Sequence, residues 1–440
     1  MTFRFSLFTF LLFLLLLSAC THDDDETAVE RGLQLSAESF VWDSQTRSQE
    51  LTISTSRTWT VTSNVAWCQP LKNSGMGKTP LRLWVNPNIT PEERTGQLTV
   101  TAGGEQKTVS LQQPAMASAD NYRYVLPVVY HVLFQNANDT TENIREGWLA
   151  KVTDGVNALY RQAHANVQFE MAQYTDDGNL LDEPGVVRHR VDFSDYDAMR
   201  FLDTAESDNR QFADYAFNIQ RTINIYVFRF ADDSELGLSD LAIMPSNHPL
   251  DSLMTLDWLN DKTTLSFPYG CCINSKYIYE KNERGMHNSL NSVATVAHEL
   301  GHYLGLLHTF SQNACEEDDA CSDTHVCDYN AYLEEVSELI KRIQDEGRTP
   351  RLDEVAKRTD CTDGSSYVAD NIMDYAYCYS TEFSPQQRTR MKHVLNYAPS
   401  VPGPKLDTYP AASTRTTLLP AEFRPRIVVC PAVPQLNRLP

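Results

Sequence analysis

Basic residues are scarce in this chain of 440 residues. It has 37 lysines and arginines against 58 aspartates and glutamates, so its formal net charge is −21 and its pI is near 4.9. Proteins that bind nucleic acid take most of their affinity from lysine and arginine side chains that neutralise phosphates. We therefore expect no nucleic-acid partner, and we attribute the acidic surface to solubility in the first place.

The apolar run at the N-terminus, from Phe5 to Leu17, is too short to cross a bilayer. It has the dimensions of the hydrophobic part of a signal peptide, and it closes on Leu17-Ser18-Ala19-Cys20. These four residues resemble a bacterial lipoprotein signal. The resemblance implies a signal peptide over 1–19, a lipid on Cys20 that anchors the protein to the outer membrane, and an acidic tether over 20–32 of the kind found in surface-exposed lipoproteins. An ordinary signal peptide is the alternative.

Composition places the rest of the chain among globular proteins. Hydrophobic residues make up 42% of the sequence and aromatic residues 10%, which argues against extensive disorder. At roughly 150 residues per domain, this length allows about two or three domains.

Residues 33–114 are predicted to form a small all-β sandwich. Short segments that alternate apolar and polar residues recur at 51–54, 59–62, 81–85 and 97–101, with glycines and prolines between them. Together with Trp59, Trp67 and the closing residues 109–113, this segment resembles a BACON-type domain. The resemblance implies an immunoglobulin-like accessory module that binds glycans, and a passive spacer is the alternative.

Strands and helices alternate after residue 121. The nearly continuous apolar run 124–134 predicts a buried strand, 143–161 predicts a helix, and 166–171 and 222–228 predict further strands. This order is typical of an α/β (or α+β) domain with a twisted sheet. We place that domain at 121–404, and the tail over 405–440 carries no recognisable chemistry.

The segment from Ala297 to His308 reads AHELGHYLGLLH and carries the main candidate site. His298 and His302 are four residues apart, so both imidazoles project from one face of a helix and can share a metal ion. Gly305 allows the backbone to turn and to present His308 as a third ligand. Three histidines leave one open position on a tetrahedral zinc ion for water.

Glu299 follows the first ligand and is placed to take a proton from that water. Zinc lowers the pKa of bound water towards about 7 and polarises a carbonyl group. The sequence therefore predicts a zinc-dependent endopeptidase that acts on proteins or peptides.

A second motif, Asn371-Ile372-Met373-Asp374-Tyr375, follows the histidines. With the long zinc motif and the segment 381–388, it resembles the pappalysin family of metzincins over about 121–404. The resemblance implies a catalytic domain with an active-site helix and Met373 in a turn beneath the metal. It also implies that the Tyr375 hydroxyl reaches the zinc or stabilises the oxyanion, and a buried structural tyrosine is the alternative.

The acidic segment after the zinc motif is the candidate for a second cation. Members of the family carry structural calcium near an Asp-Thr-Pro sequence, and here His325 replaces the proline. Carboxylate and hydroxyl oxygens suit calcium, and a solvated acidic loop explains them equally well. The candidate ligands are Asp318, Asp319, Asp323 and Thr324.

Five cysteines gather around the predicted site, at 315, 321, 327, 361 and 378. Disulfides are common in exported proteins, and sequence alone does not settle their connectivity. The family resemblance implies a Cys315–Cys361 bridge and a pairing of Cys321 or Cys327 with Cys378. The adjacent Cys271 and Cys272 cannot easily bond to each other.

Two other functions compete with a protease. One is a non-catalytic surface protein that binds glycans or proteins, and the other is a zinc amidase that acts on cell-wall peptides. Retention of Glu299 between the histidines argues against the first, and the motif around Met373 argues against the second.

Overall fold

The computed structural model describes the chain between residues 32 and 439, with gaps. The described residues are 32–120, 122–203, 210–256, 267–284, 286–312, 314–316, 319–375, 377–407, 427–431 and 438–439. The predicted signal peptide and Cys20 lie outside them. Within the described residues, the helices are all too short or too polar to span a bilayer.

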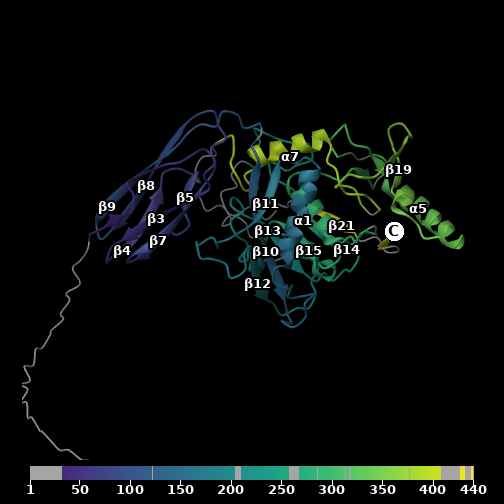
Figure 1. The fold of residues 1–440 in the computed structure, drawn as a ribbon, viewed down its shortest axis with the longest axis horizontal. Helices are drawn as coiled ribbons and strands as arrows, with labels where there is room; N and C mark the ends of the chain where they lie inside the picture. Colours follow the sequence, from purple (N-terminus) through teal and green to yellow (C-terminus); the bar gives the residue numbers. More distant parts are fainter. Residues whose placement is uncertain are drawn as a thin grey trace, which may run out of the picture.

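Two sheets form the N-terminal region (Figure 1). One has the order β1 (Gln34–Leu35), β3 (Ser48–Ser54), β7 (Thr79–Val85), β5 (Cys68–Pro70). The other has the order β2 (Ser39–Val41), β9 (Glu105–Gln113), β8 (Arg94–Ala102), β4 (Thr58–Ser63), β6 (Ser74–Met76). Apolar and polar residues alternate along these strands, so each sheet has one apolar face. Every second residue of β4 and of the second half of β8 is buried in a core shared with Leu51 and Leu83.

A larger sheet organises the second region. Its order is β11 (Val167–Met171), β10 (Tyr124–Phe134), β13 (Ile223–Phe228), β15 (Cys271–Asn274), β14 (Glu235–Asp240), β21 (Ile427–Pro431), and β12 (Val186–Arg190) pairs with the end of β10. The pairings from β11 to β15 are parallel, whereas β14 runs antiparallel to β15 and β21 antiparallel to β14.

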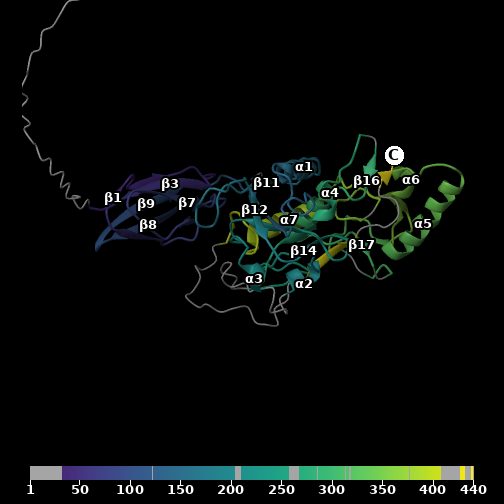
Figure 2. The ribbon, with the colours of Figure 1, turned by 90° about the horizontal axis from the view of Figure 1, so that it is seen from below.

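Helices cover both faces of this sheet (Figure 2). On one face lie α1 (Trp148–Gln162) and α4 (Ser292–Tyr303), which pack against each other where Gly155 meets Val293. On the other lie the short α2 (Ala198–Leu202) and α3 (Arg210–Ala213), whose Phe201 and Phe212 share a core with Phe228. The continuous hydrophobicity of β10 and β13 follows from this double cover.

Of the remaining elements, α5 (Tyr329–Asp345) and β19 (Lys357–Thr359) lie on the side opposite the N-terminal sheets, whereas α7 (Pro385–Tyr397) lies along the main sheet near β11 (Figure 1). The others are η3 (Ser275–Tyr277), β16 (His287–Asn288), β17 (Phe310–Ser311), β18 (Cys327–Asp328), α6 (Leu352–Val355), β20 (Ser366–Val368) and β22 (Arg438–Leu439). A separate core around α5 includes residues of β17, β18, α6 and β22, while α7 packs on the main core.

The two regions contact each other directly. Arg47 pairs with Glu170 at 2.7 Å, and the Arg82 guanidinium lies 4.1 Å from the ring centre of Tyr174. Ile89, from the N-terminal region, is buried in the core of the second region.

The fold confirms a strand-rich N-terminal region followed by a mixed α/β domain. One predicted boundary was wrong, because the helix expected from residue 143 begins at Trp148. Gly147 has a φ of 73°, a left-handed conformation that cannot continue a helix. The tail over 405–440, in which no recognisable chemistry was expected, contributes the strands β21 and β22.

Candidate metal centre

Helix α4 carries the first two histidines, and local interactions fix both of its ends. The Asn291 side chain accepts a hydrogen bond from the Val293 amide at the start. At the end, Gly305 has a φ of 89°, and the amides of Gly305 and Leu306 return to the carbonyls of His302 and Gly301. A Cβ atom at Gly305 would lie 2.7 Å from Val394, so glycine is required both by conformation and by space.

This turn brings three imidazoles together. The Nε2 atom of His302 lies 3.0 Å from those of His298 and His308. His298 and His302 are buried, and His308 is partly buried. The sequence prediction that these three residues share one point in space therefore agrees with the structure.

The second nitrogen of each helical imidazole is already engaged. The Nδ1 atom of His298 lies 2.7 Å from the Ile372 carbonyl, and that of His302 lies 2.8 Å from the Leu306 carbonyl. Because a carbonyl only accepts, each Nδ1 carries the proton, and in the neutral ring Nε2 keeps its lone pair. Burial lowers the pKa of His298 to about 4 and so favours the neutral ring.

Imidazole lone pairs that converge at such short range repel each other unless a cation lies between them. Three imidazole nitrogens, with carbonyl groups behind the rings of His298 and His302, are a donor set that suits zinc. The residues present therefore fit the metal that the sequence predicts.

Glu299 lies beside this cluster and is fully buried. It packs against β14, where a Cβ atom built on Gly237 would lie 2.5 Å from its Oε1 atom. Gly237 was not predicted as a site residue, since an isolated glycine in a strand gives only a weak indication of a close approach.

The segment around Met373 passes beneath α4. The Asp374 amide bonds to the Asn371 carbonyl and closes a turn, and the Asn371 side chain accepts from the Met373 amide at 2.9 Å. Met373 is buried, and a Cβ atom at Gly301 would lie 2.4 Å from its sulfur. This turn also supplies the carbonyl that orients His298.

Arg358 holds the turn from below and was not predicted. Its side chain is buried, lies 3.4 Å from the Asp374 carboxylate and donates to the Tyr375 carbonyl at 2.9 Å. The same guanidinium lies 3.5 Å from the ring centre of Tyr332. An isolated arginine in the sequence carries no indication of burial, so only the structure could find it.

Tyr375 lies against the histidines. The centre of its ring is 4.3 Å from that of His308 and 5.4 Å from that of His298. Its hydroxyl donates a hydrogen bond to the Val429 carbonyl in β21. Tyr375 therefore lies near the three histidines, as predicted, and its hydroxyl is bonded to the tail.

The cysteines partly follow the prediction. Cys315 and Cys361 form a disulfide. The second implied bridge is not formed: Cys378 is a buried free thiol that lies 3.2 Å from the Asn371 carbonyl, and Cys327 is also free. Neither Cys321 nor Cys327 is therefore bonded to Cys378. In β15, Cys271 and Cys272 are both free and buried, and burial raises their pKa values.

The acidic segment is held largely by protein contacts. Asp319 is buried and accepts from the Thr324 hydroxyl at 2.8 Å, and Asp323 accepts from Ser384 and from the Gln386 amide at the start of α7. Asp318 lies outside the described residues. Within the part of the chain that the structure describes, the histidine cluster is the one group of metal-ligating side chains that converge closely. Calcium remains a prediction.

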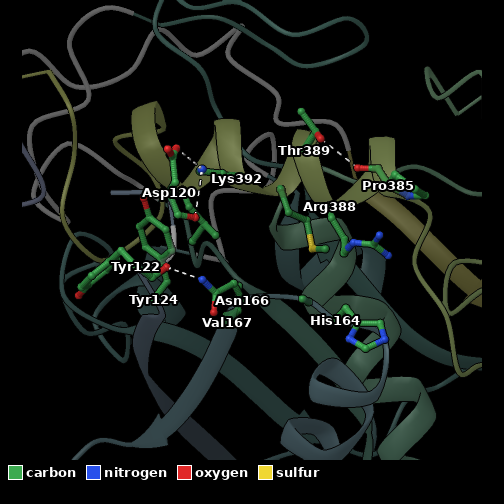
Figure 3. Close-up of a pocket in the computed structure, with 13 residues that line it drawn as sticks. Asp120, Tyr122, Tyr124, His164, Asn166, Val167, Pro385, Arg388, Thr389 and Lys392 are labelled. Atoms are coloured by element: carbon green, nitrogen blue, oxygen red, sulfur yellow. Dashed lines mark hydrogen bonds and ion pairs between the residues drawn. The ribbon is translucent and has the colours of Figure 1, made fainter. Parts of the chain in front are cut away.

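A pocket of about 240 Å³ lies elsewhere, between α7 and the starts of β10 and β11 (Figure 3). Asp120, Tyr122, Arg388 and Lys392 are among its lining residues, and Lys392 pairs with Asp120 at 3.3 Å. None of the predicted site residues lines it.

Two family matches cover most of the described chain. Residues 206–396 match peptidase family M43, described as pregnancy-associated plasma protein-A. Residues 57–114 match BACON, described as a proposed N-terminal binding domain. Residues 206–396 are thus similar to peptidase family M43 and residues 57–114 to BACON, and together with the histidine cluster these matches support a metalloprotease.

Curated relatives agree with this class. An extracellular metalloprotease of Arthroderma benhamiae is 26% identical over 247 residues, which is 54% of this chain and 73% of the relative. One of Arthroderma otae is 30% identical over 104 residues, or 23% and 32% of the two chains. Among solved structures, a Bacteroides ovatus GH5 xyloglucanase covers 46% of this chain and 38% of its own at 16% identity, but its TM-score of 0.19 supports no argument.

Proposed function

We propose that this metalloprotease is a zinc-dependent endopeptidase of the pappalysin type. The observation that carries the proposal is the convergence of the His298, His302 and His308 Nε2 atoms, with carbonyl groups behind the first two. A zinc ion held there would polarise the scissile carbonyl group and acidify water.

Glu299 is the proton carrier of this proposal. Its carboxylate takes the proton of the attacking water and passes it to the leaving nitrogen atom. Its burial beside β14 keeps the carboxylate out of bulk water, where its proton transfers would be less directed. The Tyr375 hydroxyl, once free of Val429, donates a hydrogen bond to the developing oxyanion.

The test compares the full chain with Glu299→Ala on casein and on a quenched peptide. We expect loss of at least about a hundredfold in kcat/KM, in line with the contribution of a general base, with the zinc content unchanged. Equal residual activity in both proteins would contradict the assignment and would leave a non-catalytic binding protein. Cleavage of muropeptides without cleavage of proteins would point instead to an amidase.

The metal ligands have a separate test. His302→Ala should lose stoichiometric zinc, measured by atomic absorption on dialysed protein, because two imidazoles hold the ion much more weakly than three. Full zinc content in this variant would refute the ligand set.

We also propose the location and the accessory roles. Lipidation of Cys20 would anchor the enzyme at the outer membrane, and mass spectrometry of the Cys20→Ser variant tests it. The N-terminal domain, proposed as an immunoglobulin-like sandwich, would bind glycans, as the description of BACON as a binding domain supports. A calcium site at Asp319 would show as a rise in melting temperature with added calcium.

A further inference from the structure

The tail strand β21 lies at the edge of the main sheet, next to the metal centre. It pairs antiparallel with β14 from Asp240 opposite Ile427 to Glu235 opposite Pro431. The other neighbour of β14 is β15, so without the tail β14 would expose one side of its backbone. An exposed strand edge is a surface on which an extended peptide binds by main-chain hydrogen bonds. The tail thus occupies a peptide-binding edge.

This edge reaches the proposed proton carrier. Gly237 of β14 lies against the Glu299 carboxylate, and in the ladder Gly237 is paired with Cys430. The backbone of the tail therefore crosses the sheet edge at the level of the catalytic carboxylate. A substrate whose scissile bond lies beside Glu299 would need the same space.

The tail also engages the hydroxyl proposed to stabilise the oxyanion. Tyr375 donates to the Val429 carbonyl, and its ring lies against His308. A hydroxyl has one proton to donate. While it is bonded to Val429, Tyr375 cannot donate to a substrate carbonyl.

Apolar contacts hold the tail in this position. Ile427 and Val429 pack against the core on one face of the sheet, and Val428 packs against the core on the other. Further along, β22 pairs with β16, and Leu439 is fully buried in the core that contains Tyr375. The tail is therefore fixed on two sides of the site.

We propose that residues 427–431 act as an internal competitor of peptide substrates, so that the full chain has low activity until this strand is displaced. The inference rests on the proposed peptidase function and adds its regulation. The competing ligand is an extended backbone segment of the chain itself, bound where the substrate backbone would bind.

The expected loss of activity depends on how strongly the strand binds when it is part of the same chain as the catalytic domain. A segment tethered to the domain that it binds has an effective concentration on the order of 1 mM. If the free segment binds with a Kd of about 0.1 mM, the tethered segment lowers the activity about tenfold.

The experiment uses the zinc-loaded full chain and a double substitution, Val428→Pro with Val429→Pro. Proline has no N–H group to donate, and only alternate residues of a strand face a given neighbour, so replacing both residues breaks the ladder. The matched control is Thr416→Pro with Thr417→Pro, which lies in the same tail but outside 427–431. Initial rates on a quenched peptide should rise about tenfold in the strand variant and stay within about twofold in the control.

A second readout does not depend on activity. In a Glu299→Ala background, hydrogen exchange of the β14 amides, residues 235–240, should be faster in the strand variant than in the control, because the covering strand has gone. A synthetic peptide of residues 425–431 should restore the protection when it is added at about 1 mM. Melting curves check that both variants are folded.

The outcomes separate the two proposals. Equal, non-zero activity in native protein, strand variant and control would overturn the competitor and leave the peptidase function intact. If none of the three cleaves any peptide, the peptidase function fails and this inference fails with it. Unchanged exchange of the β14 amides would overturn the pairing itself.

Discussion

Substitution of Gly237 by alanine is the sharpest test of how the site is packed. The added Cβ atom would lie 2.5 Å from Oε1 of Glu299 and 2.8 Å from its Cδ and Cγ atoms, whereas ordinary contacts are 3.4–4 Å. The strand is held by Ile273 on one side and by Cys430 on the other. The Glu299 side chain must therefore move, by about 1 Å.

A displacement of this size lowers the rate of a positioned catalytic group by about a hundredfold. We expect Gly237→Ala to lose about that factor in kcat/KM, mainly through kcat, with the zinc content unchanged because the three histidines are untouched. The assay is the initial rate on a quenched peptide, with zinc measured on the same preparation.

The matched control is Gly75→Ala in the N-terminal region. There the Cβ atom would lie 2.3 Å from Cζ2 of Trp59, so the clash is as severe but distant from the histidines. It should lower the melting temperature and leave kcat/KM unchanged. A kcat/KM of Gly237→Ala within about threefold of the native value would contradict the close packing of Glu299 on β14, and so would a rise in activity caused by loosening of the tail.

Three further predictions concern stability, each measured by urea unfolding. Arg358→Met should destabilise the chain by about 3–5 kcal/mol because it leaves Asp374 as an unpaired buried charge, and Arg358→Met with Asp374→Leu should cost less; a larger loss in the double variant would contradict the buried pair. Replacing both Cys315 and Cys361 by serine removes a disulfide that closes a loop with a separation of 46 residues. The chain entropy of such a loop predicts a loss of about 4 kcal/mol in the free energy of unfolding. An unchanged urea midpoint would show that the disulfide does not stabilise the fold. Burial lowers the pKa of His189 to about 4 from 6.5, so the unfolded chain binds more protons between these values, and stability should fall as the pH drops through that window. His189→Gln should reduce this pH dependence, and an equal dependence in both proteins would show that other groups cause it.

The sequence predicted the parts of this molecule that depend on local pattern. Alternation in 97–101 and continuous hydrophobicity in 124–134 predicted β8 and β10, because strand periodicity follows directly from burial on one or two faces. The spacing of His298 and His302 predicted their convergence, because it matches one helical turn.

What the sequence did not predict depends on contacts between distant residues. Arg358 became visible only through its burial beneath Asp374, and Gly237 only through its approach to Glu299. The tail is an intermediate case. Its β-branched run Ile427-Val428-Val429 is typical of a strand, but nothing local indicates that its partner is β14, about 190 residues earlier in the chain.

The contact between the N-terminal and catalytic regions bears on how substrates are selected. Arg47 is paired with Glu170 and Ile89 is buried in the core of the second region, and these contacts restrict how the two regions move relative to each other. Any ligand held by the N-terminal sheets would therefore lie within a restricted range of distances from the bond to be cut. Such an enzyme would choose its cleavage point on a long or glycan-bearing substrate by geometry as well as by side-chain preference.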